Sequence, residues 1–241
     1  RAHGLRVVLA DQAARVRSPA GRPAGGQSPQ AVGRVKKIRG FKLSVRPKEV
    51  HRLARKAGLD LAPFGVQPPP EGRPYALSAA SLTALSKEIE AAVKLLAPAV
   101  LYESFPGSTA ADASSKLLAP IPGVAFSLVL ATLGESIGAK KRELEGSDPQ
   151  RARLWAIICE SALAEAVRFA SSLIETEAAL ENCELSPLNP LSGNEALAAA
   201  LDRLDCSKIG VSLADHGLQP TDSAIVTLSW LSKSRGRRPK A

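Results

Sequence analysis

The sequence contains no methionine and few aromatic residues. None of the 241 residues is methionine, so we expect a chain that starts after processing or that represents part of a longer product. Only 4% of the residues are aromatic, so aliphatic side chains and alanine must form most of the core. No run of about 18 apolar residues occurs, which argues against a helix that spans a membrane. With 45% apolar residues, the composition is that of a globular domain.

Cysteine and histidine are too few and too scattered to predict a disulfide framework or a metal site. Three cysteines, at positions 159, 183 and 206, have no metal-type spacing, and their odd number favours a reduced compartment. Cys159 lies in an apolar helical stripe and is predicted to be a core residue. None of the histidines (His3, His51, His216) is predicted to be a ligand, and His51 is expected on the polar side of a basic helix. Neither a GxxxxGK loop nor a GxGxxG motif occurs, which disfavours the common nucleotide-binding enzymes.

Charge is divided unevenly along the chain. Residues 1–56 carry 15 Lys and Arg against two acidic residues, and residues 233–241 carry five basic residues and no acidic one. Residues 57–232 therefore have a net charge of −9, although the whole chain has +9. Basic ends of this kind either bind polyanions, such as nucleic acid, acidic proteins or anionic lipid, or act as solubilising tails.

Residues 1–35 are predicted to form a basic arm without stable structure. The stretch from Arg17 to Gln30 is rich in Pro, Gly, Ser and Gln and cannot bury enough apolar surface to fold alone. Arginine is frequent and acid is almost absent, as in an organelle transit peptide. The arm is thus either a transit-peptide remnant, which would place the protein in a mitochondrion or chloroplast, or a segment of a cytoplasmic protein that orders on a partner.

The central part of the chain predicts an α+β fold with a mixed or antiparallel sheet, a long central helix and several shorter helices. Alternating or continuous apolar runs predict strands over 37–45, 99–105, 124–134, 208–215 and 221–231. Helical periodicity and end signals predict helices over 47–57, 82–97, 135–144, 149–182 and 194–206. Ser81 is the expected N-cap of the second helix and Asp148 that of the long one. Strands and helices do not alternate regularly in this order, which favours the α+β class over the α/β class. We divide the chain into an arm (1–35), a domain (36–232) and a basic tail (233–241).

A GxSxG motif at residues 134–138 raises the hypothesis of a serine hydrolase. It lies between a predicted buried strand and a helix, where a nucleophile elbow would occur. Asp205 or Asp215 and then His216 follow in the order of a catalytic triad. Ser136 would attack, His216 would act as the base and the aspartate would orient the imidazole. Against this hypothesis, no oxyanion loop of the HGGG type precedes the motif, and short patterns recur by chance.

Several segments of the domain form a set of motifs in a fixed order. They are Glu49–Gly58, Ala97–Tyr102, Val124–Gly134, the start of the long helix at Asp148, the loop Leu185–Pro187, and Ile209–Pro220 with Ser223. Taken in this order, they resemble the activation domain of vitamin B12-dependent methionine synthase, and more closely its free-standing relatives. The resemblance covers about residues 36–232, and it implies the fold of that family and its association with cobalamin and S-adenosylmethionine.

The same resemblance points to a ligand loop whose residues are altered here. The family's S-adenosylmethionine loop would correspond to Glu184, Ser186 and Pro187, with Glu184 where the family has an arginine. Leu188 and Asn189 replace a Gly-Tyr pair, and Asp222 replaces a lysine near the end. A carboxylate at the arginine position would repel a ligand carboxylate, so the resemblance implies the fold while the site residues argue for a lost or altered ligand function.

Three functions remain open from the sequence. The first is a non-catalytic binding or structural module, a subunit of a larger protein or ribonucleoprotein assembly, without a cofactor. The second is an accessory protein of cobalamin-dependent methyl transfer that binds S-adenosylmethionine or a corrinoid protein, and the third is the Ser136 hydrolase. For the first function, the expected partner-binding residues, including possible contacts to RNA, are Arg34, Lys36, Lys37, Arg39, Lys42, Arg235, Arg237 and Arg238.

Overall fold

The computed structural model describes residues 35–67, 77–107, 117–119 and 121–233. All of them fall within one unit of the chain, residues 31–241. Of the predicted arm and the predicted basic tail, only Val35 and Lys233 are among the described residues. None of the described helices is long and apolar enough to cross a membrane.

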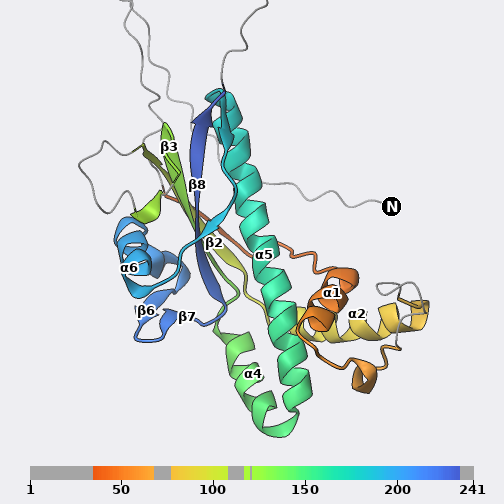
Figure 1. The fold of residues 1–241 in the computed structure, drawn as a ribbon. Helices are drawn as coiled ribbons and strands as arrows, with labels where there is room; N and C mark the ends of the chain where they lie inside the picture. The colour runs from red at the N-terminus through yellow and green to blue at the C-terminus, as the bar shows by residue number, and fades with distance from the viewer. Residues whose placement is uncertain (1–34, 68–76, 108–116, 120, 234–241) are drawn as a thin grey trace, which may run out of the picture. The chain divides into compact units, whose positions relative to one another are not determined.

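One antiparallel sheet forms the centre of the domain (Figure 1). Its strand order is β1-β2-β3-β8-β4, and the short β5 also pairs with β8. Strand β3 lies in the middle, between β2 and β8, and all eight of its residues are buried. The bounds are β1 Lys36–Arg39, β2 Ala99–Pro106, β3 Ala125–Thr132, β4 Cys183–Leu185, β5 Asn189–Pro190 and β8 Ser223–Ser232.

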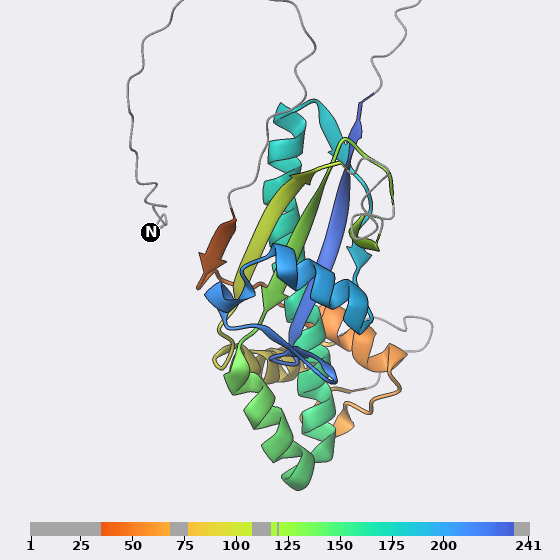
Figure 2. The same cartoon turned by 90° about the vertical axis from the view of Figure 1, so that its left-hand side faces the viewer.

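Helices cover both faces of this sheet. The long α5 lies along one face, with α1 and α2 packed against it, while α6 and a small hairpin of β6 and β7 cover the other face (Figures 1 and 2). Helix α4 runs back alongside the first turns of α5. The bounds are α1 Pro47–Lys56, α2 Ala79–Val93, α4 Glu135–Ser147, α5 Pro149–Leu180, α6 Asn194–Arg203, β6 Ser212–Ala214 and β7 Gly217–Gln219.

Alternation along the strands produces two apolar cores. Because successive side chains of a strand point to opposite faces, Val100 and Tyr102 join the core under α5, whereas Leu101 joins the core under α6. Strand β3 divides in the same way, with Val129 towards α5 and Leu128 towards α6. A strand that is apolar on both faces is therefore required at the centre.

Local signals explain where the long helix begins and how closely it packs. The Asp148 carboxylate accepts a hydrogen bond from the Arg151 amide at 3.0 Å, and Pro149 occupies the first turn, as the sequence predicts. The face of α5 that meets the sheet is rich in small side chains, which allow the helix and sheet backbones to approach closely. Its fully buried alanines include Ala162, Ala166 and Ala170.

The predicted α+β class is confirmed, and the sheet is antiparallel. Four local predictions differ from the structure. Ser78, not Ser81, is the N-cap of α2, since its hydroxyl accepts from the Ser81 amide. The predicted first strand ends at Arg39, and β4 and β5 lie where no strand is predicted. The segment predicted as a strand over 208–215 forms part of a short 3-10 helix (Cys206–Ile209) and the strand β6.

Candidate functional site

The first glycine of the GxSxG motif has a structural role at the start of α4. Gly134 has φ +85°, and a Cβ there would lie 3.0 Å from the Ala97 Cβ, so this position favours glycine. Gly138 lies on α4 beside Thr221 and Asp222. Ser136 itself is exposed in the first turn of α4. Glycine at position 134 thus allows the chain to pass from β3 into α4 while its backbone lies close to Ala97.

The other predicted triad members are placed on exposed surface. His216 and Asp215 form the turn between β6 and β7. Asp205 accepts a hydrogen bond from the Ser207 hydroxyl at 2.6 Å and pairs with Lys208, and both interactions lower the pKa of its carboxyl. Within the described residues, no hydrogen bond joins Ser136 to His216 or His216 to either aspartate. The described residues therefore contain no assembled triad, and the hydrolase remains a prediction from the motif alone.

The serine–proline loop, predicted from the resemblance, is held to β8 by hydrogen bonds of its own. The Ser186 hydroxyl accepts a hydrogen bond from the Ser229 amide at 2.9 Å and donates one to the Pro187 carbonyl at 3.0 Å. The Ser186 amide also donates to the Ser229 carbonyl, so this buried residue fastens the loop to β8. Glu184 is exposed on β4 and presents a negative charge. Here Ser186 serves the fold, and Glu184 would repel an anionic ligand group.

The predicted basic residues fall into three groups. Lys36 pairs with Glu177 at 2.5 Å, and Arg39 donates to the carbonyl of Lys208, so these two side chains have partners within the domain. The exposed ones near the start of the domain are Lys37 and Lys42. The remaining four, Arg34, Arg235, Arg237 and Arg238, lie outside the described residues.

Two cysteines and a histidine are buried. Burial raises the pKa of the Cys159 thiol to about 12, with a further contribution from the nearby Asp222 carboxylate. Burial also raises the pKa of Cys183, so neither thiol is prepared for nucleophilic attack. His51 is only 3% exposed, which corrects the expectation that it lies on the polar side of its helix. Burial, and then the charge of Arg55, lower the pKa of His51.

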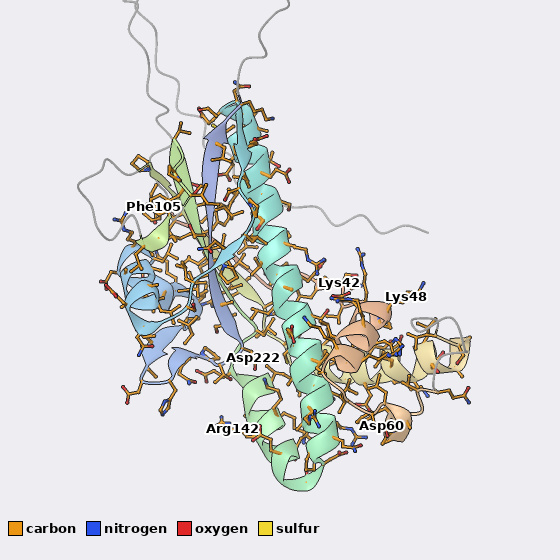
Figure 3. All side chains as sticks on the ribbon, viewed as in Figure 1. Lys42, Lys48, Asp60, Phe105, Arg142 and Asp222 are labelled. Atoms are coloured by element: carbon orange, nitrogen blue, oxygen red, sulfur yellow. The ribbon has the colours of Figure 1, made fainter. Side chains whose placement is uncertain are left out.

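A cavity near the start of β8 is the site that the sequence does not reveal. It has a volume of about 380 Å³, and its walls are α4 and the segment from Gln219 to Thr221. Next to it, the Lys141 ammonium lies 2.6 Å from the Asp222 carboxylate, and both side chains are largely buried. The two residues are 81 positions apart, so no local motif could predict their meeting. Figure 3 shows Asp222 at the end of the sheet next to α4.

A second cavity, of about 310 Å³, borders α1. His51, Arg55 and the apolar side chains of Leu59, Leu61 and Val66 line it. The His51 Nδ1 is buried there without a hydrogen-bond partner. In the described part of the chain, no group of three His, Cys, Asp or Glu side chains is placed to hold a metal ion.

The described residues define an α+β domain with one antiparallel sheet and a long helix across it. No family model matches the chain, and no curated protein does. Among solved structures it is similar to the crystal structure of the MetH reactivation domain bound to AdoHcy, with a TM-score of 0.45 and 14% sequence identity. The match covers 84% of this chain and 80% of that one. The likeness is one of fold.

Proposed function

We propose that this protein is a non-catalytic module that attaches to a polyanionic surface of a larger assembly through its basic ends. The observation that carries the proposal is the charge of the segment that leads from the N-terminal arm into the domain. Residues 36–56 contain nine Lys and Arg and a single acidic residue, Glu49. The arm before it is basic as well, so the positive charge of the sequence continues from the arm into the domain.

Several of these basic side chains are left available by the fold. Lys42, Lys48 and Lys56 are exposed, and none of them forms an ion pair with another residue of the described segments. Figure 3 shows Lys42 near α1 and Lys48 on it. Ion pairs consume some of the neighbouring charge, as between Arg52 and Glu49 at 2.7 Å. The three exposed lysines give a polyanion direct access to positive charge.

The opposite sign of the remainder supports an oriented attachment. Residues 57–232 carry a net charge of −9, so a polyanion is attracted to the ends and repelled by the body. Lysine and arginine contacts to phosphates release counterions, which gives affinity without sequence specificity and a steep dependence on salt. Attachment through such basic ends requires no reactive side chain, and it therefore suits a structural subunit more than an enzyme.

The test compares two double charge reversals in the full chain. In Lys42→Glu with Lys48→Glu, binding to a single-stranded RNA of mixed sequence is expected to weaken by about tenfold at moderate salt. Lys87→Glu with Lys94→Glu changes the net charge equally at exposed positions on α2 and directly after it, and is the matched control. Fluorescence anisotropy at several salt concentrations measures both. Equal weakening by the two variants, or no binding by the unmodified chain, would contradict the proposal.

The native size of the protein gives an independent test. On a sucrose gradient of extract from its source, the chain is expected to sediment with a particle far larger than its 25.2 kDa mass. Release by nuclease would identify RNA or DNA as the polyanion, and resistance would identify an acidic protein surface. Migration as a free chain would contradict the proposed attachment.

A further inference from the structure

The cavity between α4 and the entry to β8 has no part in the function proposed above. Its walls come from α4 and from residues 219–221, and the ion pair of Lys141 with Asp222 joins the two at 2.6 Å. The side chains of this pair are 16% and 10% exposed, so the link is shielded from bulk water and from salt. The walls are therefore held in a fixed relation to one another.

Charged groups of both signs line this cavity. Glu135 and Glu145 supply two carboxylates, and Lys141 and Arg142 supply two cations. Arg142 donates only a long Nε hydrogen bond, of 3.4 Å, to the Gly138 carbonyl, so the rest of its guanidinium has no partner among the described residues. Glu145 has no such partner either, although it lies three positions from Arg142. A free cation and a free anion thus face one space.

A buried carboxylate lies beside the cavity. Asp222 is 8% exposed, and its Oδ2 is buried without a hydrogen-bond partner. A Cβ at Gly138 would lie 3.8 Å from this oxygen and 3.8 Å from the Thr221 hydroxyl, so the absence of a side chain at Gly138 preserves room beside them. The other carboxylate oxygen, Oδ1, accepts one of the three hydrogen bonds that the Lys141 ammonium can donate. No other described residue accepts from the remaining two donors, and Lys141 lines the cavity.

We propose that this cavity binds a small zwitterion of the free amino-acid class. The four charged lining groups sum to zero, and Asp222 beside them adds one negative charge. A simple anion would therefore meet excess negative charge, and a simple cation would meet Lys141 and Arg142. A molecule with one carboxylate and one ammonium can pair with the cations and with the carboxylates of the cavity at the same time. Its carboxylate binds the guanidinium of Arg142 and the Lys141 ammonium, and its ammonium binds Glu145.

The test is a titration of the ¹⁵N-labelled full chain, followed by NMR. A panel of free L-amino acids at about 10 mM is expected to include ligands that shift the amide signals of Gly138, Lys141 and Thr221 in a saturable way. The N-acetyl derivative of the best ligand lacks the ammonium, and its carboxamide derivative lacks the carboxylate. Each derivative is expected to bind about tenfold more weakly than the free amino acid.

Variants separate this site from a general charge effect. Arg142→Ala and Glu145→Gln are each expected to weaken binding by about tenfold. Lys140→Ala is the matched control, because Lys140 lies on the same helix but pairs with Glu143 outside the cavity. Gly138→Leu fills the space and is expected to abolish binding, whereas Gly138→Ala, which meets only ordinary contacts, keeps it.

Three results would overturn the inference. They are an unchanged spectrum with every amino acid of the panel, equal binding of phosphate alone or of the N-acetyl derivative, and equal loss in the Lys140→Ala control. Circular dichroism verifies that each variant is folded, and Arg142→Ala and Glu145→Gln keep the test valid if Gly138→Leu does not fold.

Discussion

At the scale of single residues, several side chains that resemble site residues serve the fold instead. Ser186 is the clearest case, because its hydroxyl and its amide both bond to Ser229 of the neighbouring strand. Gly134 is needed for its positive φ and its approach to Ala97. A sequence motif can therefore point to a residue with a defined role, but the contacts of that residue in the fold show whether the role is structural or functional.

The buried His51 makes stability depend on pH. Burial lowers its pKa, so between about pH 5 and pH 7 the unfolded chain binds more protons at this residue than the folded chain does. The free energy of unfolding therefore rises with pH in this range and decreases as the pH falls. His51→Gln is expected to reduce this slope, measured by urea denaturation at several pH values.

The exposed His216, replaced by glutamine, is the matched control for that measurement. If His216→Gln reduced the slope as much as His51→Gln, or if His51→Gln left it unchanged, the burial of His51 would not be its cause.

At the scale of elements, the long helix depends on small side chains for its packing. Ala166 of α5 is fully buried against the sheet. Ala166→Leu adds three carbon atoms to a filled space and is expected to lower the free energy of unfolding by about 1–3 kcal/mol. Ala164→Leu makes the same change on the exposed side of α5 and is expected to have little effect. Urea denaturation compares them, and equal losses would contradict this account of the packing.

The elements that could be predicted from sequence are those with strong local signals. The apolar run from Val124 to Gly134 predicts the central strand, and Asp148 with Pro149 predicts the start of α5. The short strands β4 and β5 could not be predicted, because they exist only through pairing with β8. The predicted N-cap of α2, Ser81, lies three residues after the observed N-cap, Ser78. Both serines precede the same apolar stripe, so the sequence alone does not distinguish them.

At the scale of the whole molecule, a lost or altered ligand function at the serine–proline loop stays a prediction from the resemblance to the methionine synthase activation domain. Glu184 is exposed and negative, and the Ser186 hydroxyl is already bonded. Titration calorimetry with S-adenosylmethionine at about 1 mM is therefore expected to give no heat of binding. A saturable heat that Glu184→Ala alters, and that Glu195→Ala on the exposed surface of α6 leaves unchanged, would contradict this expectation and favour the cofactor-linked alternative.

Periodicity, capping and composition were enough to predict the class of the fold, the central strand, the long helix and the division of charge. These signals act over a few neighbouring residues or over the chain as a sum, so they can be read without the fold. Contacts across the fold were needed to learn that His51 is buried, that Ser186 fastens a loop, and that Lys141 meets Asp222 beside a cavity. The last two of these contacts join residues 43 and 81 positions apart, and such segments meet only when the sheet brings them together.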